Sequence, residues 1–549
     1  MPYQFLIPRE LILDSIADLS QIIFYTTLRN RSCMNTHQIR FIIFICSYFL
    51  CGNFLKAQNS QPNIVFIFSD DHAYQAISAY HEDRKLIQTP HIDRIAEEGM
   101  RFDRCLVTNS ICGPSRATVL TGTYSHINGF YNNTTSRFDG SQITFPKLLQ
   151  NVGYQTAIIG KWHLESEPTG FNFWQILIGQ GVYYNAPMIL NGKKIKTSGY
   201  ITDTITDSSI KWLETRDKSK PFLLMCQNKA PHRGWEPSLS NLNYDNDRIY
   251  PEPPTLFDDY SGRGVAEHNQ DMMIAKPGKF GLNDLDLKLI TPTDLNPEQR
   301  KIWDSYYEPR NAAFRAEHLS GRALVKWKYQ RYMHDYLATV LSVDQGVAKI
   351  LDYLDKNNLS KNTIVVYSSD QGFYLGEHGW LDKRWIFEES LRAPLMIRWP
   401  GVIKPGSINH NIVSNLDFAE TFLDAAGVKQ PERMQGRSLM PLMRGEEPKD
   451  WRTAFYYQYY EYPRPHHVMP HYGIITDRYK LVQFYGTKNN YTELFDLKND
   501  PRELLSVYNN TTYSTIQKSL SQELINLRKE LKVPDKTTSS AFGKEDLDD

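Results

Sequence analysis

Asn63-Ile64-Val65-Phe66-Ile67-Phe68 is a continuous apolar run, and the chain turns polar directly after it. Such a run is typical of a strand in a parallel sheet that is covered on both faces. Similar runs follow at residues 154–160, 221–226, 363–367 and 395–399. Helical patterns separate them, at residues 90–98, 145–151, 203–214, 329–357 and 418–426. The alternation predicts an α/β sheet. Residues 233–323 carry little periodicity, so we expect a long irregular insertion there.

Acidic residues follow two of these strands. The first strand continues into Ser69-Asp70-Asp71-His72, and the strand at 363–367 continues into Ser368-Ser369-Asp370-Gln371-Gly372. Ligands of open α/β sheets bind beyond the carboxyl ends of the strands, so the two clusters are expected to meet. Three carboxylates and an amide oxygen suit a hard divalent cation, Ca²⁺ in preference to Mg²⁺. Each Asp alone could equally be a helix cap or a turn former. Two such clusters, together with the Cys112 motif described next, favour a metal site.

A third motif, Cys112-Gly113-Pro114-Ser115-Arg116, places a thiol at the start of a predicted helix. Pro114 suits the first helical position and Arg116 lies one turn on, which outlines an anion-binding nucleophile site. A buried Cys at an ordinary helix start is the alternative. The motif, with Leu120-Thr121-Gly122 after it, resembles the activation motif of type I sulfatases, whose Cys is oxidised to Cα-formylglycine by a formylglycine-generating enzyme. In that family the aldehyde hydrate attacks sulfur, and its second hydroxyl then allows sulfate to be expelled.

The resemblance extends from about residue 62 to about residue 501, with five separated motifs in the family's order. It implies an alkaline-phosphatase-like α/β/α sandwich with a smaller C-terminal domain on an antiparallel sheet. It also implies a metal shell formed by Asp70, Asp71, Asp370, Gln371 and the formylglycine at Cys112. Gln371 stands where many relatives carry Asn.

Further motifs follow strands and supply cations and imidazoles. Lys161 and His163 in Gly160-Lys161-Trp162-His163 lie on one side if the chain stays extended, although a surface Lys and a core His would give the same pattern. The resemblance implies that Lys161 and Lys383 bind sulfate, that His163 helps to deprotonate the hydrate, and that His232 protonates the leaving alcohol. Arg116 would orient the hydrate and nearby carboxylates. We also expect substrate contacts from a set of basic residues: His72, Arg233, Arg384, His467 and His471.

The chain has 549 residues, and its 62 Lys and Arg residues balance 62 Asp and Glu residues, which gives no indication of nucleic-acid binding.

Residues 1–57 are interpreted as an N-terminal extension plus a signal peptide, with an apolar stretch at 41–50 and cleavage after Ala57. The stretch is too short for a stable membrane span. A start at Met34 would give an ordinary signal peptide, and lipidation at Cys51 is less favoured. We therefore expect the export machinery to deliver the protein to the periplasm or the extracellular space.

The remaining chain divides into a catalytic domain at 58–450, a smaller α+β domain at 451–536 and a polar tail at 537–549 that we expect to be disordered. Cys105 and Cys226 could pair or stay as buried thiols. In the C-terminal domain, residues 461–471 carry three His; a Zn site is conceivable, but His contacts to an anionic sugar are the simpler hypothesis.

Residues 230–235, 254–264 and 461–473 look like segments of exported bacterial sulfatases that act on polysaccharides, including glycosaminoglycan 6-sulfatases and enzymes for algal polymers such as ulvan. The sequence therefore predicts hydrolysis of a sulfate ester on a carbohydrate. A phosphate or phosphonate ester hydrolase of the same fold is the alternative enzyme. A sugar-binding protein that never acquires the modification is the alternative of another class.

Overall fold

The computed structural model describes residues 61–276, 281–463, 465–486 and 490–535. The predicted signal peptide, the Met34 start, Cys51 and the polar tail lie outside the described residues. The described residues belong to one compact unit that begins at Gln61. The division at residues 450 and 451 therefore stays a prediction. No helix in the described part of the chain is long and apolar enough to cross a membrane.

Within the described residues the central sheet has 11 strands, in the order β10-β2-β9-β8-β1-β7-β3-β4-β5-β6, with β11 paired to β2. The strands of this sheet are β1 (Asn63–Ser69), β2 (Met100–Leu106), β3 (Gln155–Gly160), β4 (Phe173–Leu177), β5 (Pro187–Leu190), β6 (Lys193–Lys196), β7 (Phe222–Gln227), β8 (Thr363–Ser369), β9 (Arg392–Arg398), β10 (Ser407–Asn409) and β11 (Val413–Ser414). Strands β8, β1, β7, β3 and β4 run parallel. The apolar run at 395–399 suggested another parallel strand, but β9 is antiparallel to both β2 and β8. The sheet is therefore mixed.

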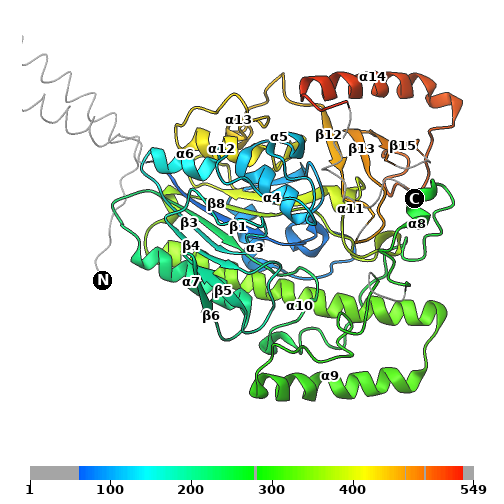
Figure 1. Ribbon diagram of the computed structural model, residues 1–549, viewed down its shortest axis with the longest axis horizontal. Helices are drawn as coiled ribbons and strands as arrows, with labels where there is room; N and C mark the ends of the chain where they lie inside the picture. Colours follow the sequence, from blue (N-terminus) through cyan, green and yellow to red (C-terminus); the bar gives the residue numbers. More distant parts are fainter. Residues whose placement is uncertain (1–60, 277–280, 464, 487–489, 536–549) are drawn as a thin grey trace, which may run out of the picture. The chain divides into compact units, whose positions relative to one another are not determined.

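Helices cover both faces of this sheet (Figure 1). Side chains of β1 alternate between the faces: Ile64, Phe66 and Phe68 belong to one buried cluster, whereas Val65 and Ile67 belong to the other. The first cluster is covered by α4 (Cys112–Thr121), α6 (Phe145–Asn151), α12 (Asp417–Ala425) and α13 (Met440–Met443). The second is covered by α3 (Pro90–Glu97), α7 (Ile201–Thr215) and α10 (Gly321–Lys356). This arrangement confirms the predicted α/β/α sandwich.

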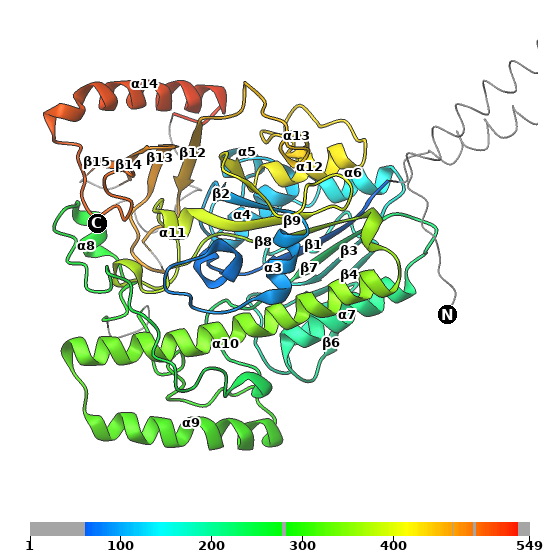
Figure 2. The same ribbon diagram turned by 180° about the vertical axis from the view of Figure 1, so that it is seen from behind.

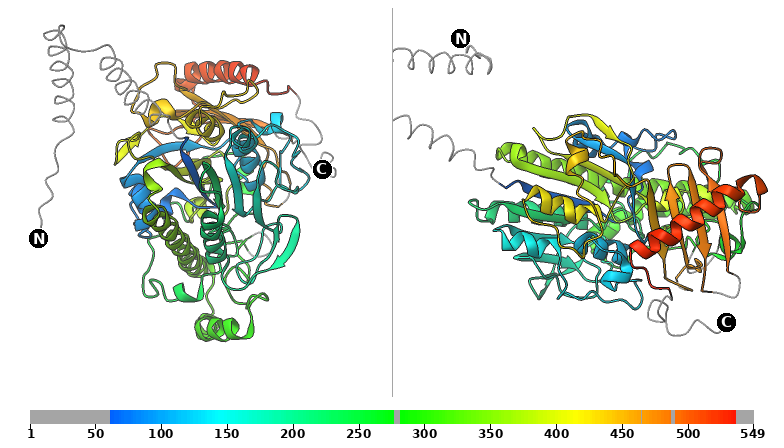
Figure 3. Two further views of the ribbon diagram at one scale, coloured as in Figure 1. Left: turned by 90° about the vertical axis from the view of Figure 1, so that its left-hand side faces the viewer. Right: turned by 90° about the horizontal axis from the view of Figure 1, so that it is seen from above.

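A separate antiparallel sheet forms the C-terminal part, in the order β12-β13-β14-β15. Its strands are β12 (Ala454–Tyr459), β13 (His471–Thr476), β14 (Tyr479–Phe484) and β15 (Tyr491–Asp496). Helix α14 (Ser514–Glu530) lies across it, as the view from above in Figure 3 shows. Leu520 and Leu524 of α14 share a buried cluster with strand residues and with Trp385 and Phe387. The loop after β8 is thereby anchored against this sheet.

The insertion expected at 233–323 is partly helical, so that prediction is wrong for its second half. Helix α9 (Pro297–Glu317) begins with a capping box of Asn296 and Gln299, and Gly321 already begins α10. Only Trp303, Tyr307 and Asn311 of α9 are buried, and Pro309 interrupts the helical pattern. A helix with so narrow a buried stripe carries little periodic signal.

The remaining helices are short and lie in the connections: α5 (Ser125–Asn128), α8 (Val265–Asn269) and α11 (Glu388–Leu391). Single 3₁₀ turns are η2 (Tyr74–Ala76), η3 (Ser78–Tyr80), η4 (Leu239–Asn241), η5 (Ser360–Asn362), η6 (Glu377–Gly379) and η7 (Thr511–Tyr513).

Candidate active site

Strand register brings the sequence motifs together at one edge of the sheet. Ser69 at the end of β1 pairs with Ser369 at the end of β8, so Asp70 and Asp370 leave the sheet side by side. Gly160 at the end of β3 pairs with Gln227 of β7, which places Lys161 at the same edge. Gly160 has a φ of +112°, and a Cβ there would lie 1.9 Å from the carbonyl oxygen of Gln227. Only Gly fits at this close approach.

The carboxylates of Asp70, Asp71 and Asp370 are buried and offer ligand atoms within 4.8 Å of one another. The backbone N–H of Asp71 donates to Asp370 Oδ1 at 3.1 Å. Burial, together with the repulsion from Asp70, raises the pKa of Asp370 to about 8. Burial also raises the pKa of Asp71 to about 6, although Lys383 opposes this. Crowded buried carboxylates are costly unless a cation compensates them.

The donor set fits a divalent cation. Asp70 Oδ1 and Gln371 Oε1 are buried acceptors without a hydrogen-bond partner among the described residues. The amide nitrogen of Gln371 donates to Asp71 Oδ1, which leaves the amide oxygen as the atom available to a metal. All these atoms are oxygens, the ligands that Ca²⁺ and Mg²⁺ prefer.

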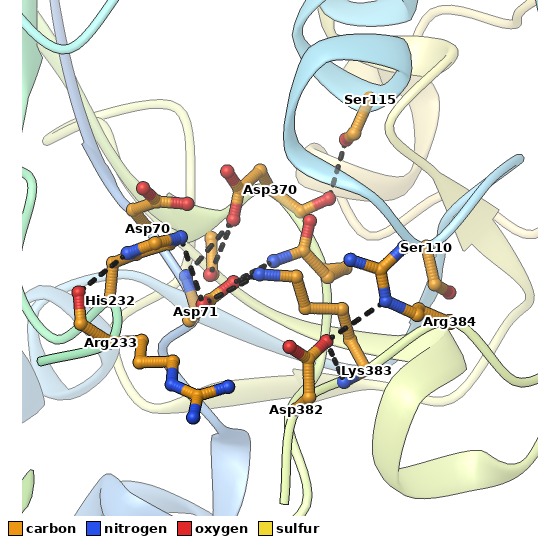
Figure 4. Close-up of polar contacts among 12 residues, drawn as sticks. Asp70, Asp71, Ser110, Ser115, His232, Arg233, Asp370, Asp382, Lys383 and Arg384 are labelled. Atoms are coloured by element: carbon orange, nitrogen blue, oxygen red, sulfur yellow. Dashed lines mark hydrogen bonds and ion pairs between the residues drawn. The ribbon is translucent and has the colours of Figure 1, made fainter. Parts of the chain in front are cut away.

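We call the buried group formed by Asp70, Asp71, Lys161, Asp370, Gln371 and Lys383 the strand-end cluster. Lys161 Nζ donates to Asp70, and Lys383 Nζ lies 2.6 and 2.7 Å from the two oxygens of Asp71. Figure 4 shows Lys383, Asp71 and Asp370 converging. The cations of the cluster therefore lie within reach of any anion that enters it.

Cys112 is the first residue of α4, two residues earlier than the helix start predicted at Pro114. The helix is buried throughout, and Cys112 Sγ lies within 4.8 Å of ligand atoms of Asp70 and His232. Burial raises the pKa of the Cys112 thiol. Ser115 Oγ donates to the carbonyl oxygen of Asp370, which ties the helix start to the strand-end cluster (Figure 4).

Arg116 lies one turn after Cys112 and contacts carboxylates rather than open space. Its Nε and one terminal nitrogen donate to Asp370 Oδ2 at 3.2 and 3.0 Å. Its other terminal nitrogen donates to the carbonyl oxygen of Lys161 and to Gln227 Oε1, each at 3.0 Å. Arg116 thus joins Asp370 to Lys161 and Gln227, and its role in orienting the aldehyde hydrate stays a prediction.

His232 points its Nε2 toward the strand-end cluster, 3.8 Å from Asp71 Oδ2. Its Nδ1 lies 2.8 Å from the carbonyl oxygen of Arg233. A carbonyl can only accept, so Nδ1 carries a proton and Nε2 is free to gain or lose one. Burial, followed by the charge of Lys161, lowers the pKa of His232.

His163 lies on the same loop as Lys161, but its φ of 53° shows that the chain is not extended there. Its Nδ1 is buried without a hydrogen-bond partner among the described residues. Burial and the neighbouring charge of Lys161 lower the pKa of His163. It lies close enough to the strand-end cluster for the charges of Lys161 and Asp70 to act on its ring.

A second group of charges lies beside the first, and we call it the outer cluster: Arg233, Asp286, Asp382, Arg384 and Glu461. Arg384 forms a buried ion pair with Glu461 and lies 3.4 Å from Asp382. Arg233 Nε donates to Asp286 Oδ1 at 2.9 Å. His466 Nε2 lies 3.0 Å from Asp382 Oδ2, so it is the His of segment 461–471 that reaches this group.

Sequence reasoning missed Asp286, Glu461 and Gln180, whose Oε1 accepts from Lys161 Nζ at 2.5 Å. Each lies in a loop or at a strand end with no motif around it. Only the position of Glu461, in the His-rich segment, gave a signal that could have found it.

Two of the residues predicted to contact substrate have both ring nitrogens hydrogen-bonded within the protein. His72 is fully buried, and its ring nitrogens lie 2.5 Å from Tyr367 Oη and 3.2 Å from the carbonyl oxygen of Ala76. His471 is also fully buried; its Nε2 accepts from the backbone N–H of Ile386, and its ring stacks on Trp385. Burial lowers the pKa of each to about 4. Both are neutral core residues.

His467 is half-exposed, and its Nδ1 lies 3.1 Å from Asp271 Oδ2, so the structure does not bring it to either cluster. Cys105 and Cys226 are both buried free thiols, which answers the question of pairing between them.

The sandwich fold and the residues gathered at its strand ends define an alkaline-phosphatase-like hydrolase. A sequence profile of the sulfatase family matches residues 62–428. A second profile, of the C-terminal part of N-sulphoglucosamine sulphohydrolase, matches residues 376–530. The first match covers more than half of the chain, so the chain belongs to the sulfatase family and hydrolyses sulfate esters.

Three relatives refine this assignment. The chain is 50% identical over 502 residues to an N-acetylglucosamine-6-O-sulfatase of Bacteroides thetaiotaomicron, covering 88% of this chain and 89% of the relative. A solved structure, of a protein in complex with its substrate D-glucosamine-2-N,6-O-disulfate, has a TM-score of 0.84 at 50% identity and covers 87% of this chain and 99% of that one. An ulvan-active sulfatase of Formosa agariphila is 25% identical over 514 residues, covering 89% of this chain and 87% of the relative. The chain thus fits a bacterial glycosaminoglycan sulfatase.

Proposed function

We propose that this sulfatase removes the 6-O-sulfate of glucosamine residues in a sulfated saccharide. The observation that carries the proposal is the 50% identity, over nearly the whole of both chains, to a relative named for that activity. The solved relative with a glucosamine disulfate substrate supports the same sugar. Ulvan, which the sequence also suggested, has weaker support because the ulvan-active relative is only 25% identical.

Cys112 is proposed to work as Cα-formylglycine, installed by a formylglycine-generating enzyme of the host. Its position supports this, because a group at Cys112 lies beside both the strand-end cluster and His232. The hydrated aldehyde would supply the attacking hydroxyl and the means of releasing sulfate. A divalent cation, for which we propose Ca²⁺, would be held by Asp70, Asp71, Asp370 and Gln371, and would polarise the S–O bond.

Other side chains of the site have roles that follow from their charges. Lys161 and Lys383 would attract the sulfate oxygens, since their ammonium groups reach into the strand-end cluster. Arg116 holds Asp370 in place and does not need to touch substrate.

His232 would protonate the leaving alcohol from its imidazolium form, which a bound sulfate ester favours because its negative charge opposes the lowering of the His232 pKa by burial and Lys161. Its Nε2 faces the cluster while Nδ1 is fixed on a backbone carbonyl, so the ring is oriented with one nitrogen available for proton transfer. His163 is proposed to assist deprotonation of the hydrate.

The outer cluster would bind the sugar. Arg384 and Asp382 present a donor and an acceptor next to Lys383, and Arg233 lies on the segment that carries His232. Such a pair suits the hydroxyls of a hexose ring held at the end of a chain.

We also propose that the protein is exported to the periplasm or the extracellular space.

A panel of defined sulfated sugars tests the function, with released sulfate as the readout. It comprises glucosamine carrying sulfate at N and O6, N-acetylglucosamine carrying sulfate at O6 or at O3, and a sulfated ulvan oligosaccharide. We expect a kcat/KM at least about tenfold higher for the 6-O-sulfates than for the others. Release only from the 3-O-sulfate or from ulvan would reject the proposal. Protein with Cys112→Ala controls for contaminating activity.

A further inference from the structure

A cavity of about 250 Å³ lies between α9 and the first half of α10, on a part of the molecule that the active site does not use. We call it the α9–α10 cavity. Its lining includes four aromatic rings: Tyr306, Tyr307, Phe314 and Trp327. Phe314 of α9 stacks on Trp327 of α10, with ring centroids 3.6 Å apart. Figure 2 shows α9 alongside α10, on the side away from the central sheet.

Helix α10 separates this cavity from the active site. Tyr336 Oη donates to the carbonyl oxygen of Asp71 at 2.8 Å, so that side of the helix supports the strand-end cluster. Asp335, the residue before it, instead lines the α9–α10 cavity. Neighbouring positions on a helix point about 100° apart, so the two sites face different directions.

Two arginines of the cavity lie on the aromatic rings. The guanidinium of Arg310 is 3.7 Å from the ring centroid of Tyr306, and that of Arg331 is 5.1 Å from Trp327 and 5.3 Å from Tyr307. Each donates one hydrogen bond to a backbone carbonyl, of Tyr306 and Leu287 respectively. Among the described residues neither forms an ion pair with a carboxylate. Their remaining N–H groups are therefore available to an anion.

Two carboxylates, of Asp335 and Glu317, also line the cavity. Asp335 is 3% exposed, and its Oδ1 accepts from Tyr307 Oη at 2.7 Å. Its Oδ2 has no hydrogen-bond partner among the described residues, and the ammonium of Lys288 is 3.5 Å away. The ion pair with Lys288 compensates the charge of this oxygen, but its hydrogen-bonding capacity is left for a ligand or water.

We propose that the α9–α10 cavity is a second, non-catalytic binding site for a sulfated oligosaccharide. Tyr306, Phe314 and Trp327 are only partly buried, and their accessible parts would pack on the apolar face of a sugar ring. Arg310 and Arg331 would bind a sulfate through the N–H groups that the protein leaves free. Asp335 would accept from a sugar hydroxyl. The proposal goes beyond hydrolysis, because it assigns a site that holds the polymer while another part of it is processed.

Calorimetric titration with a heparin-derived hexasaccharide tests the proposal on the full chain carrying Cys112→Ala, so that no sulfate is released. We expect two binding events. Adding Arg310→Gln and Arg331→Gln should remove one of them, or weaken it at least about tenfold. Arg315→Gln is the matched control, because Arg315 lies on α9, donates to the carbonyl of Leu289 and does not line the cavity. If the double variant binds like the control, the proposal is wrong.

Two further measurements keep the outcome clear. Thermal denaturation shows whether the double variant folds; if it does not, the exposed Arg310→Gln alone replaces it, with the same expectation of weaker binding. Unsulfated chitohexaose should bind the cavity at least about tenfold more weakly than the hexasaccharide, and equal binding would overturn the role of the arginines. Hydrolysis of a 6-O-sulfated monosaccharide by protein with Cys112 intact should not change, which separates this proposal from the proposed function.

Discussion

The strand-end cluster and the outer cluster lie next to each other but are built in different ways. Asp70, Lys161 and Asp370 are placed by the register of β1, β3 and β8, three strands of one rigid sheet. The outer cluster draws Arg233 and Asp286 from the long insertion and Glu461 from the end of the C-terminal sheet. Strand register thus places Asp70, Lys161 and Asp370 before any ion pair adds to the first cluster, whereas side-chain ion pairs join the loops of the second. This difference suggests that chemistry and sugar recognition are separable.

The two clusters also differ in how far their polar and charged groups are paired within the protein. In the part of the chain that the structure describes, Asp70 Oδ1 and Gln371 Oε1 of the strand-end cluster have no hydrogen-bond partner, which fits the proposed cation. In the outer cluster, Arg384 is already compensated by Glu461 and Asp382. Changes in the first cluster should therefore reduce turnover, and changes in the second should mainly alter KM.

Cys112→Ala gives the largest expected effect. It removes the group proposed to attack sulfur, so kcat should fall on the order of 10⁴-fold or more for sugar and aryl sulfates alike. Cys105→Ala is the control, because Cys105 is also buried but lies in β2, outside the site. Kinetics with both substrates, together with mass spectrometry of the peptide that carries Cys112, check this. Turnover that survives in Cys112→Ala would remove that residue from the mechanism.

Metal removal should have the next largest effect. Chelation leaves three buried carboxylates with only the lysines and Arg116 to compensate them, and several kcal/mol of charge stabilisation are lost. We expect kcat/KM to fall about 10³-fold and to return on adding Ca²⁺. Elemental analysis before and after chelation provides the control. Full activity in protein shown to be free of metal would refute a metal site at Asp70, Asp71 and Asp370.

The sequence predicted the strand-end cluster better than the outer cluster, because strands place the first and loops place the second. Asp70 and Asp370 could be placed together because each follows an apolar strand, and parallel strands end at a common edge. Nothing local connects Asp286 or Glu461 with the arginines that they compensate, since the partners meet only through loop conformation. The same holds for His72 and His471, which look like site residues beside their motifs but have both ring nitrogens hydrogen-bonded in the core.

The fold shows a similar limit. Buried strands such as β1 and β8 carry their own pattern, and they were found within two residues at each end. Helix α9 was missed because most of its surface is solvent-exposed and Pro309 lies inside it. An edge strand as short as β10 (Ser407–Asn409) has too few residues to show an alternating pattern of apolar and polar side chains.

His232→Ala changes a residue that lies between the two clusters. The Nε2 of His232 faces Asp71, and the next residue, Arg233, belongs to the outer cluster. Loss of the proton donor should lower kcat about 10²- to 10³-fold for a sugar sulfate, whose alcohol is a poor leaving group. An aryl sulfate needs no protonation and should lose less than about tenfold, so it is the internal control. Equal losses on both substrates would reject the role of general acid.

Glu461→Gln should have the smallest effect and addresses the outer cluster alone. Glu461 is 4% exposed; one oxygen pairs with Arg384, and the other accepts from the backbone N–H of Asn133 at 3.0 Å. The amide keeps the volume and the second contact but leaves the buried guanidinium with Asp382 as its remaining carboxylate neighbour. Removing one partner of a buried pair is destabilising, here by about 2 kcal/mol because the isostere still accepts a hydrogen bond.

For the same variant we expect KM for a 6-O-sulfated glucosamine to rise about tenfold with kcat nearly unchanged, because Arg384 can no longer be held in one orientation. Kinetics on the sugar and on an aryl sulfate, alongside urea unfolding, separate binding from stability. Glu446→Gln, at an exposed ion pair with Arg444, should change none of these quantities. A fall in kcat equal on both substrates would show that Glu461 acts on the strand-end cluster, and that recognition and chemistry are not separable in this enzyme.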